Sequence, residues 1–120
     1  MELRKISPEE LQEILRKHRL WLVHDGGERA NLEGANLERA YLKGANLVGA
    51  NLDYSCLPLW CGSLNANFDD RQLRQIAYHL VKAGLQSNNA SDETKAELAK
   101  LIDFANQFHR FYECGRIERM

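Results

Sequence analysis

Three cysteines and two of the histidines are the side chains that could hold a metal ion. Zinc prefers thiolate sulfur and imidazole nitrogen, and a tetrahedral site takes four such ligands. Cys56 and Cys61 are five positions apart rather than the three of a zinc knuckle. His109 and Cys114 are also five apart, a spacing that does not align them on one helix face. We therefore predict no metal and no cofactor; the metal candidates, should one bind, are Cys56, Cys61 and Cys114.

Aromatic and charged side chains in the same part of the chain could bind a small ligand or a protein partner. Aromatic rings offer stacking faces, and a guanidinium pairs with carboxylate or phosphate. The candidate binding residues are Tyr54, Trp60, His79, His109, Arg110 and Glu113. The structural alternative is that Trp60 plugs an end of the fold while Arg110 pairs with Glu113 at helical spacing.

Nucleophilic catalysis would need a cysteine activated by a histidine. His79 or His109 could lower the pKa of a thiol and so raise its thiolate fraction. No recognisable oxyanion hole or family signature accompanies these residues. We therefore predict that the protein is not an enzyme.

A five-residue repeat contains Tyr54 and Cys56 and precedes the other candidates, so it must position part of them. Leucine recurs at every fifth residue from Leu32 to Leu57, and a small residue lies two positions before each leucine. Asparagine usually fills the position between them, with Tyr41 and Cys56 as departures. A period of five fits neither a helix nor a strand. Such fixed self-similarity indicates a solenoid, whose repeats bury their apolar residues by stacking on one another.

The repeats read ERANL, EGANL, ERAYL, KGANL and VGANL, and this pattern resembles the pentapeptide-repeat family. The resemblance implies a short right-handed quadrilateral parallel β-helix with four repeats per turn. In that fold the leucines and small residues point inward, so Leu32 stacks beneath Leu52 and Leu37 beneath Leu57, about 4.8 Å apart. Repeats within residues 28–68 make fewer than two turns. Both ends of so short a stack need caps that cover apolar surface and unpaired edges.

The N-terminal cap is predicted to be a helix over residues 7–20. Ser7 can cap this helix, Pro8 suits its first position, and Glu10 completes a capping box. The face of this helix that packs on the first coil is predicted to comprise Leu11, Ile14, Leu15 and His18. Trp21 and Leu22 follow and are expected to be wedged into the core. Gly26 and Gly27 should then turn the chain into the repeats.

The C-terminal cap is predicted to be a helical hairpin over residues 69–120. Residues 66–68 read as a last repeat out of phase, and Asp69 or Asp70 caps a helix that runs through about Leu85, with Gly84 as its stop. The apolar face of that helix is expected to comprise Leu73, Ile76, Ala77, Leu80 and Val81. Ser91 caps a third helix that runs to about Tyr112, with Gly115 as its stop.

The third helix carries more apolar residues than one face can bury within the chain. Its wide apolar arc comprises Leu98, Leu101, Ile102, Phe104, Ala105, Phe108, Phe111 and Tyr112. Isologous pairing is the commonest way to cover such a patch. We therefore expect a homodimer through the C-terminal helices.

We expect a single domain, mainly a β solenoid with α-helical caps. Its three parts are the N-terminal cap (residues 1–27), the repeats (28–68) and the C-terminal helical hairpin (69–120). The chain has 120 residues, 44% of them hydrophobic, and a formal net charge of −1. That charge argues against direct nucleic-acid binding and against an anionic membrane surface. With no apolar span, no signal core and three cysteines that read as free thiols, we expect a cytoplasmic protein.

The predicted function is a non-enzymatic protein-interaction module. The chain is similar to small pentapeptide-repeat proteins of bacterial and prophage genomes, which suggests inhibition of a host enzyme or defence component. One alternative is a small-ligand or metal-binding protein that uses the regions around Trp60 and Cys61 and around His109 and Cys114. The second alternative is a DNA mimic that modulates a topoisomerase. Against mimicry, the repeats balance four acidic against three basic residues and form no acidic stripe.

Overall fold

The computed structural model describes residues 2–58 and 66–118 and divides the chain into two compact units. Unit 1 is Met1–Asp69 and unit 2 is Asp70–Met120. Trp60 and Cys61 lie outside the described residues. The boundary between the units falls next to the predicted start of the C-terminal cap. Whether the chain folds as one domain stays a prediction.

The repeats of unit 1 stack as predicted. The backbone N–H of Leu32 donates to the carbonyl of Asn51 at 2.8 Å, and the N–H of Asn51 donates to the carbonyl of Ala30 at 3.0 Å. Parallel bridges join Asn31 with Asn51, Asn36 with Cys56, and Asn46 with Asn67. The first two pairs are 20 residues apart, so one turn of this β-helix segment holds four repeats. The last pair is 21 apart, which confirms that residues 66–68 return one position out of phase.

Local hydrogen bonds close the corners of the coil, two of them at each corner that follows an asparagine. The N–H of the small residue donates to the carbonyl of the leucine three positions before it, as in Ala35 to Leu32 at 3.0 Å. The asparagine side chain accepts from the N–H two positions later, and this bond recurs at Asn31, Asn36, Asn46 and Asn51. Glycines with positive φ occupy the same place in three corners: Gly34, Gly44 and Gly49. Sequence analysis identified the inward residues but missed this role of asparagine.

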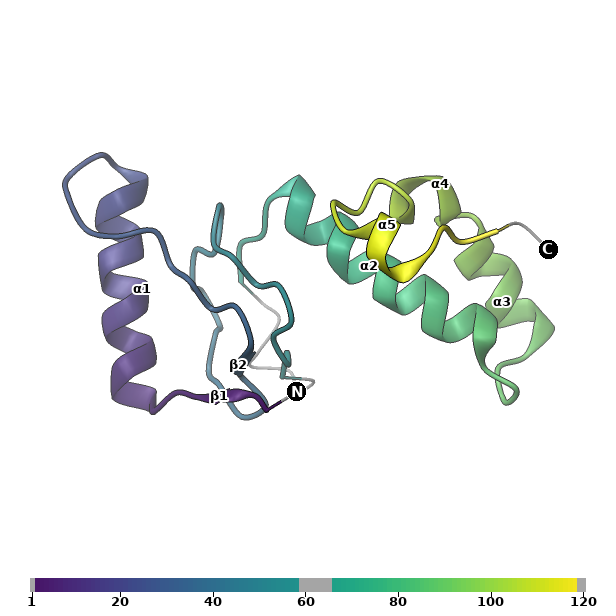
Figure 1. The fold of residues 1–120 in the computed structure, drawn as a ribbon, viewed down its shortest axis with the longest axis horizontal. Coiled ribbons are helices and arrows are strands. Elements are labelled where there is room, and N and C mark those ends of the chain that lie inside the picture. Colours follow the sequence, from purple (N-terminus) through teal and green to yellow (C-terminus); the bar gives the residue numbers. More distant parts are fainter. Residues whose placement is uncertain (1, 59–65, 119–120) are drawn as a thin grey trace. The chain divides into compact units, whose positions relative to one another are not determined.

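The core of unit 1 is a column of leucines. Five of them have at most 5% of their surface exposed: Leu32, Leu37, Leu42, Leu47 and Leu52. Leu57, at the end of the column, is only partly buried. Helix α1, Pro8–Leu22, adds Leu11 and Leu15 to the same core and lies beside the coil in Figure 1. The predicted inward register of the repeats is therefore confirmed.

The N-terminal segment covers the first coil with a strand and a helix. Strand β1, Arg4–Lys5, pairs in parallel with β2, Ala35–Asn36. The Ser7 hydroxyl then accepts from the N–H of Glu10 at 3.1 Å and starts α1, as predicted. A guanidinium nitrogen of Arg4 also donates to the carbonyl of Asn31 at 2.6 Å. Strand and side chain together satisfy part of the edge that a short coil would leave open.

The end of α1 is held by His18 and Trp21. The His18 ring is fully buried, whereas Trp21 is 39% exposed and stacks on it with centroids 5.4 Å apart. A Cβ at Gly49 would lie 3.2 Å from the Trp21 ring, so this glycine permits the contact. The prediction of Trp21 as a core wedge is wrong, because its ring covers His18 and a corner of the coil from outside. Gly26 and Gly27 then turn the chain with φ of 78° and 72°, as predicted.

Unit 2 is helical. Its elements are α2 (Asp70–Gln86), α3 (Asp92–Ala99), α4 (Ile102–Ala105) and α5 (Phe111–Cys114). Helices α3 and α4 pack against α2, as Figure 1 shows. The buried core comprises Tyr78, Val81, Ile102, Ala105, Phe108 and Ile117. No described helix is long and apolar enough to cross a membrane.

The predicted apolar face of α2 is wrong at Leu73 and Leu80, whereas Val81 is buried as predicted. Leu73 and Leu80 are 43% and 54% exposed, while the buried positions are Gln72, Gln75, Tyr78 and Val81. The helix is turned so that the large Tyr78 ring is buried and its hydroxyl donates to the carbonyl of Gly115.

Gly84 is also not a stop, because α2 continues to Gln86. A Cβ at Gly84 would lie 2.1 Å from a methyl group of Leu98, so this glycine allows α3 to approach α2.

The predicted third helix is broken into three pieces. Buried residues Ile102, Ala105 and Phe108 follow a spacing of three, and the joints between the pieces use hydrogen bonds to the third preceding residue. Asn106 further fixes the break, because its side-chain amide donates to and accepts from the backbone of Ile117 at 2.9 and 2.8 Å. Gly115, with φ of 94°, ends α5 as predicted.

Candidate functional site

The predicted binding residues are divided between the two units. In unit 1, Tyr54 is 48% exposed at a corner of the coil, where its φ of 61° matches that of the corner glycines. Cys56 is partly buried and pairs with Asn36 between the coils. The predicted contributions of Trp60 and Cys61 fall outside the described residues. Tyr54 and Cys56 therefore belong to the repeat framework itself.

In unit 2 the structure brings His79 and His109 together around one aromatic ring. Their centroids lie 5.3 and 5.0 Å from that of Phe108, and both contacts are edge-on. Partial burial lowers the pKa of His79 below its ordinary value of 6.5, and the nearby Lys82 ammonium lowers it further. These two rings pack as a small aromatic group, and their predicted binding role stays a prediction.

Arg110 and Glu113 form an ion pair at 2.8 Å, as the structural alternative predicted. Cys114 is exposed at the end of α5, and its carbonyl accepts from the Lys82 ammonium. Within residues 2–58 and 66–118, no three histidine, cysteine, aspartate or glutamate side chains cluster as a metal site requires. The described residues thus give the metal alternative no support.

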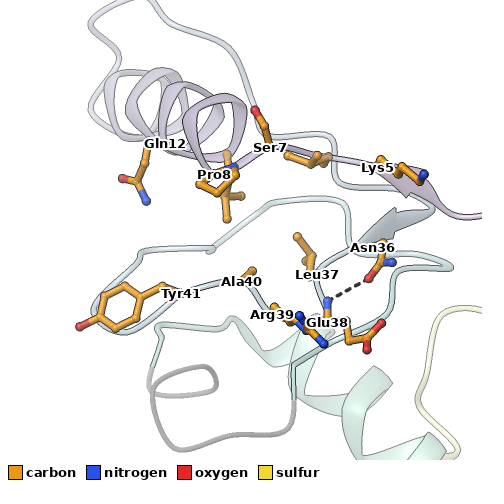
Figure 2. Close-up of a pocket in the computed structure, with 12 residues that line it drawn as sticks. Lys5, Ser7, Pro8, Gln12, Asn36, Leu37, Glu38, Arg39, Ala40 and Tyr41 are labelled. Carbon is orange, nitrogen blue, oxygen red and sulfur yellow. Dashed lines mark hydrogen bonds between the residues drawn. The ribbon is translucent and has the colours of Figure 1, made fainter.

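A concave surface lies in unit 1, between the start of α1 and the first coil. We call this surface the groove; Figure 2 shows its two walls. One wall is formed by Lys5, Ile6, Ser7, Pro8, Leu11 and Gln12. The other is formed by Asn36, Leu37, Glu38, Arg39, Ala40 and Tyr41. Its volume of about 620 Å³ is in the range of ligand-binding clefts.

Both walls of the groove are fixed by hydrogen bonds. Lys5 is held opposite Asn36 by the register of β1 and β2. The Asn36 side chain accepts from the N–H of Glu38 at 3.0 Å, a bond drawn in Figure 2, and so sets the corner. On the other wall the Ser7 cap fixes where α1 begins. Strand pairing and local hydrogen bonds thus set the positions of both walls.

Two groove residues depart from the repeat pattern. Arg39 occupies the corner position that glycine holds in the two adjacent repeats, at Gly34 and Gly44. Tyr41 occupies the asparagine position, and its side chain is 57% exposed. A tyrosine cannot make the amide-oxygen hydrogen bond that closes the neighbouring corners. Arg39 and Tyr41 are two positions apart in the same repeat, and both line the groove.

Comparison with known families bears directly on these repeats. Residues 28–58 match the family model described as pentapeptide repeats (8 copies). This segment is a pentapeptide-repeat segment. Searches of curated proteins and of solved structures gave no significant match to the chain.

The pentapeptide-repeat segment supplies only one wall of the groove. The wall of residues 5–12 precedes the matched segment. Sequence analysis noted Tyr41 as a departure but did not identify Lys5, Gln12 or Arg39 as site residues. The available signal was the pair of departures in a single repeat, Arg39 and Tyr41.

Proposed function

We propose that the protein is a non-enzymatic protein-interaction module and that the groove of unit 1 is its binding site. The observation that supports this most is the placement of Arg39 and Tyr41 on an ordered cleft. Tyrosine and arginine are enriched in the cores of protein interfaces, because each combines a large contact area with hydrogen bonding.

The pentapeptide-repeat segment suits such a role because its coil is held by backbone pairing and a packed leucine column. A binding surface on ordered elements loses little conformational entropy when the partner binds. From the resemblance to small bacterial and prophage proteins, we infer that the partner is a host enzyme or defence component that binding inhibits.

Photocrosslinking from two exposed tyrosine positions tests this proposal. A photoreactive phenylalanine analogue replaces Tyr41, at the groove, or Tyr54, at another corner of the coil. We expect a discrete crosslinked protein from position 41 and not from position 54, in extracts of the host. Identical products from both positions, or none from position 41, would contradict the groove as the interaction site.

The two alternatives have less support. Mimicry of DNA requires a continuous acidic surface, yet Glu38 and Arg39 share one corner and bring opposite charges. For the ligand-binding alternative, His79 and His109 lie against Phe108, and Arg110 is already paired with Glu113.

A further inference from the structure

We propose that the groove binds a short linear peptide segment that carries a carboxylate beside an apolar side chain. This inference rests on the proposed function, because it specifies the chemistry of the partner at the same site. The argument has three parts: the apolar surface of the groove, its charge, and the departures from the repeat pattern.

The groove offers an apolar surface between polar ends. Ile6, Pro8, Leu11, Leu37 and Ala40 line it from both walls; Leu11 and Leu37 are themselves buried, so Ile6, Pro8 and Ala40 provide its accessible apolar surface. In Figure 2, Leu37 points from the coil toward Ser7 and Pro8, while Lys5 and Tyr41 lie at opposite ends. An apolar side chain of the partner can be buried between such walls, with polar atoms directed to the ends. The volume of about 620 Å³ suits a few residues of chain rather than a folded domain.

The charge of the groove differs in sign from that of the chain. Its lining contains two cationic side chains, Lys5 and Arg39, and one carboxylate, Glu38, which leaves one net positive charge. The whole chain has a formal net charge of −1. The side chains of Lys5 and Arg39 are exposed and form no ion pair within residues 2–58 and 66–118. A partner carboxylate can therefore bind them without displacing an internal one.

Arg39 and Tyr41 differ from the residues at the same positions of the two adjacent repeats. The repeats on either side have glycine and asparagine at these two positions, and Asn36 and Asn46 accept hydrogen bonds from the N–H groups of Glu38 and Val48. Residues that depart from a repeat pattern and line a cleft are candidates for a functional role. Arg39 adds a planar guanidinium and Tyr41 adds a ring and a hydroxyl, which match a carboxylate and an apolar side chain.

Binding is tested with labelled peptides of about seven residues and the intact protein. One probe has Glu-Leu-Asp-Phe at its centre, the second Lys-Leu-Lys-Phe, and the third Gln-Leu-Asn-Phe. Fluorescence anisotropy should show saturable binding of the acidic probe, weaker by at least about threefold when the salt concentration is raised. Amide chemical shifts of residues 5–12 and 36–41 should change with it. Equal binding of the basic probe, or no binding of the acidic one, would overturn the peptide class.

Two variants restore the repeat pattern and provide the sharpest test. Arg39→Gly and Tyr41→Asn should fold as well as the parent, yet bind the acidic probe roughly tenfold more weakly, the usual effect of losing a charged hydrogen bond or an aromatic contact. Lys43→Ala, which removes a cation outside the groove, is the matched control and should bind normally. Equal weakening by all three variants would show that binding does not depend on the groove, and it would overturn the proposal. Should peptides fail while position 41 still crosslinks one protein, the proposed function stands and only the acidic peptide class is wrong.

Discussion

Nδ1 of His18 accepts a hydrogen bond from the backbone N–H of Ala30 at 3.0 Å, within a ring that is fully buried. Because Nδ1 accepts, the ring proton is on Nε2, which donates to the carbonyl of Val48 at 2.8 Å. One imidazole thus connects α1 to the start of the coil and to one of its corners. Helix α1 is held by this polar link as well as by Leu11 and Leu15.

We predict that His18→Phe destabilises the protein by about 2–4 kcal/mol, since it leaves two buried backbone groups without a partner. His18→Gln keeps one donor and one acceptor and should lose clearly less. Urea unfolding measures both. Equal losses for the two variants would mean that ring packing, and not the pair of hydrogen bonds, holds the helix.

Leu47 and Val48 provide a test of the inward register. Leu47 is fully buried, so Leu47→Ala should cost about 2–5 kcal/mol of unfolding free energy. Val48 is 37% exposed, and Val48→Ser should change the stability by less than about 0.5 kcal/mol. Similar urea midpoints for both variants would contradict the register.

Tyr54 has a backbone conformation that disfavours its side chain. Its φ of 61° lies where a residue other than glycine loses about 1–2 kcal/mol. Tyr54→Gly should therefore be neutral or stabilising by up to about 1 kcal/mol, whereas Tyr54→Val should be destabilising. Thermal unfolding compares the two. A valine variant as stable as the glycine variant would show that the corner is not strained.

His79 should make the stability of unit 2 depend on pH. Its pKa is lowered in the folded state by burial and by Lys82, so the unfolded state binds more protons once the pH falls below about 6.5. Stability should therefore fall as the pH is lowered from 7 to 5, and this fall should be smaller in His79→Gln. The ring is partly in water, so we expect a modest change. Unfolding at pH 7 and pH 5 tests it, and an identical pH dependence in the variant would exclude His79 as the cause.

The homodimer through the C-terminal helices stays a prediction, and α2 offers a further surface for it. In the third apolar segment Ile102, Ala105 and Phe108 are buried in the core of unit 2, while Leu101 and Tyr112 are exposed; α2 in turn exposes Leu73 and Leu80 two turns apart, with Ile76 partly buried between them. We expect this stripe to pair with a second copy. Light scattering should give twice the 13.8 kDa mass of the chain, reduced to one chain by Leu80→Glu. A single-chain mass for the parent would reject the dimer.

The sequence predicted the coil well because its five-residue repeats resemble the pentapeptide-repeat family, and that resemblance implies four repeats per turn with the leucines inward. It predicted α1 because Ser7, Pro8 and the apolar spacing agree with one another. The sequence did not predict which face of α2 is buried. Leu73 and Leu80 are apolar residue types, but the helix buries Tyr78, whose hydroxyl donates to the carbonyl of Gly115 near the C-terminus.

The groove could not be predicted for a different reason. One wall depends on β1, whose two residues, Arg4 and Lys5, show no strand pattern in the sequence. Their position is fixed only by pairing with Ala35 and Asn36. Arg39 and Tyr41 are visible as departures in the sequence, but the wall opposite them is a tertiary feature.

The pairing of residues 20 positions apart sets how this coil can change length during evolution. The returning segment has Asn67 beside Asn46, and Asp69 accepts from the N–H of Gly49 at 2.7 Å. Insertion of one repeat would move both residues a quarter turn, to a different side of the coil. Insertion of four repeats would leave them on the same side, one layer further along. Insertions that keep the equivalent contacts should therefore come in multiples of about twenty residues, which is one full turn of the coil.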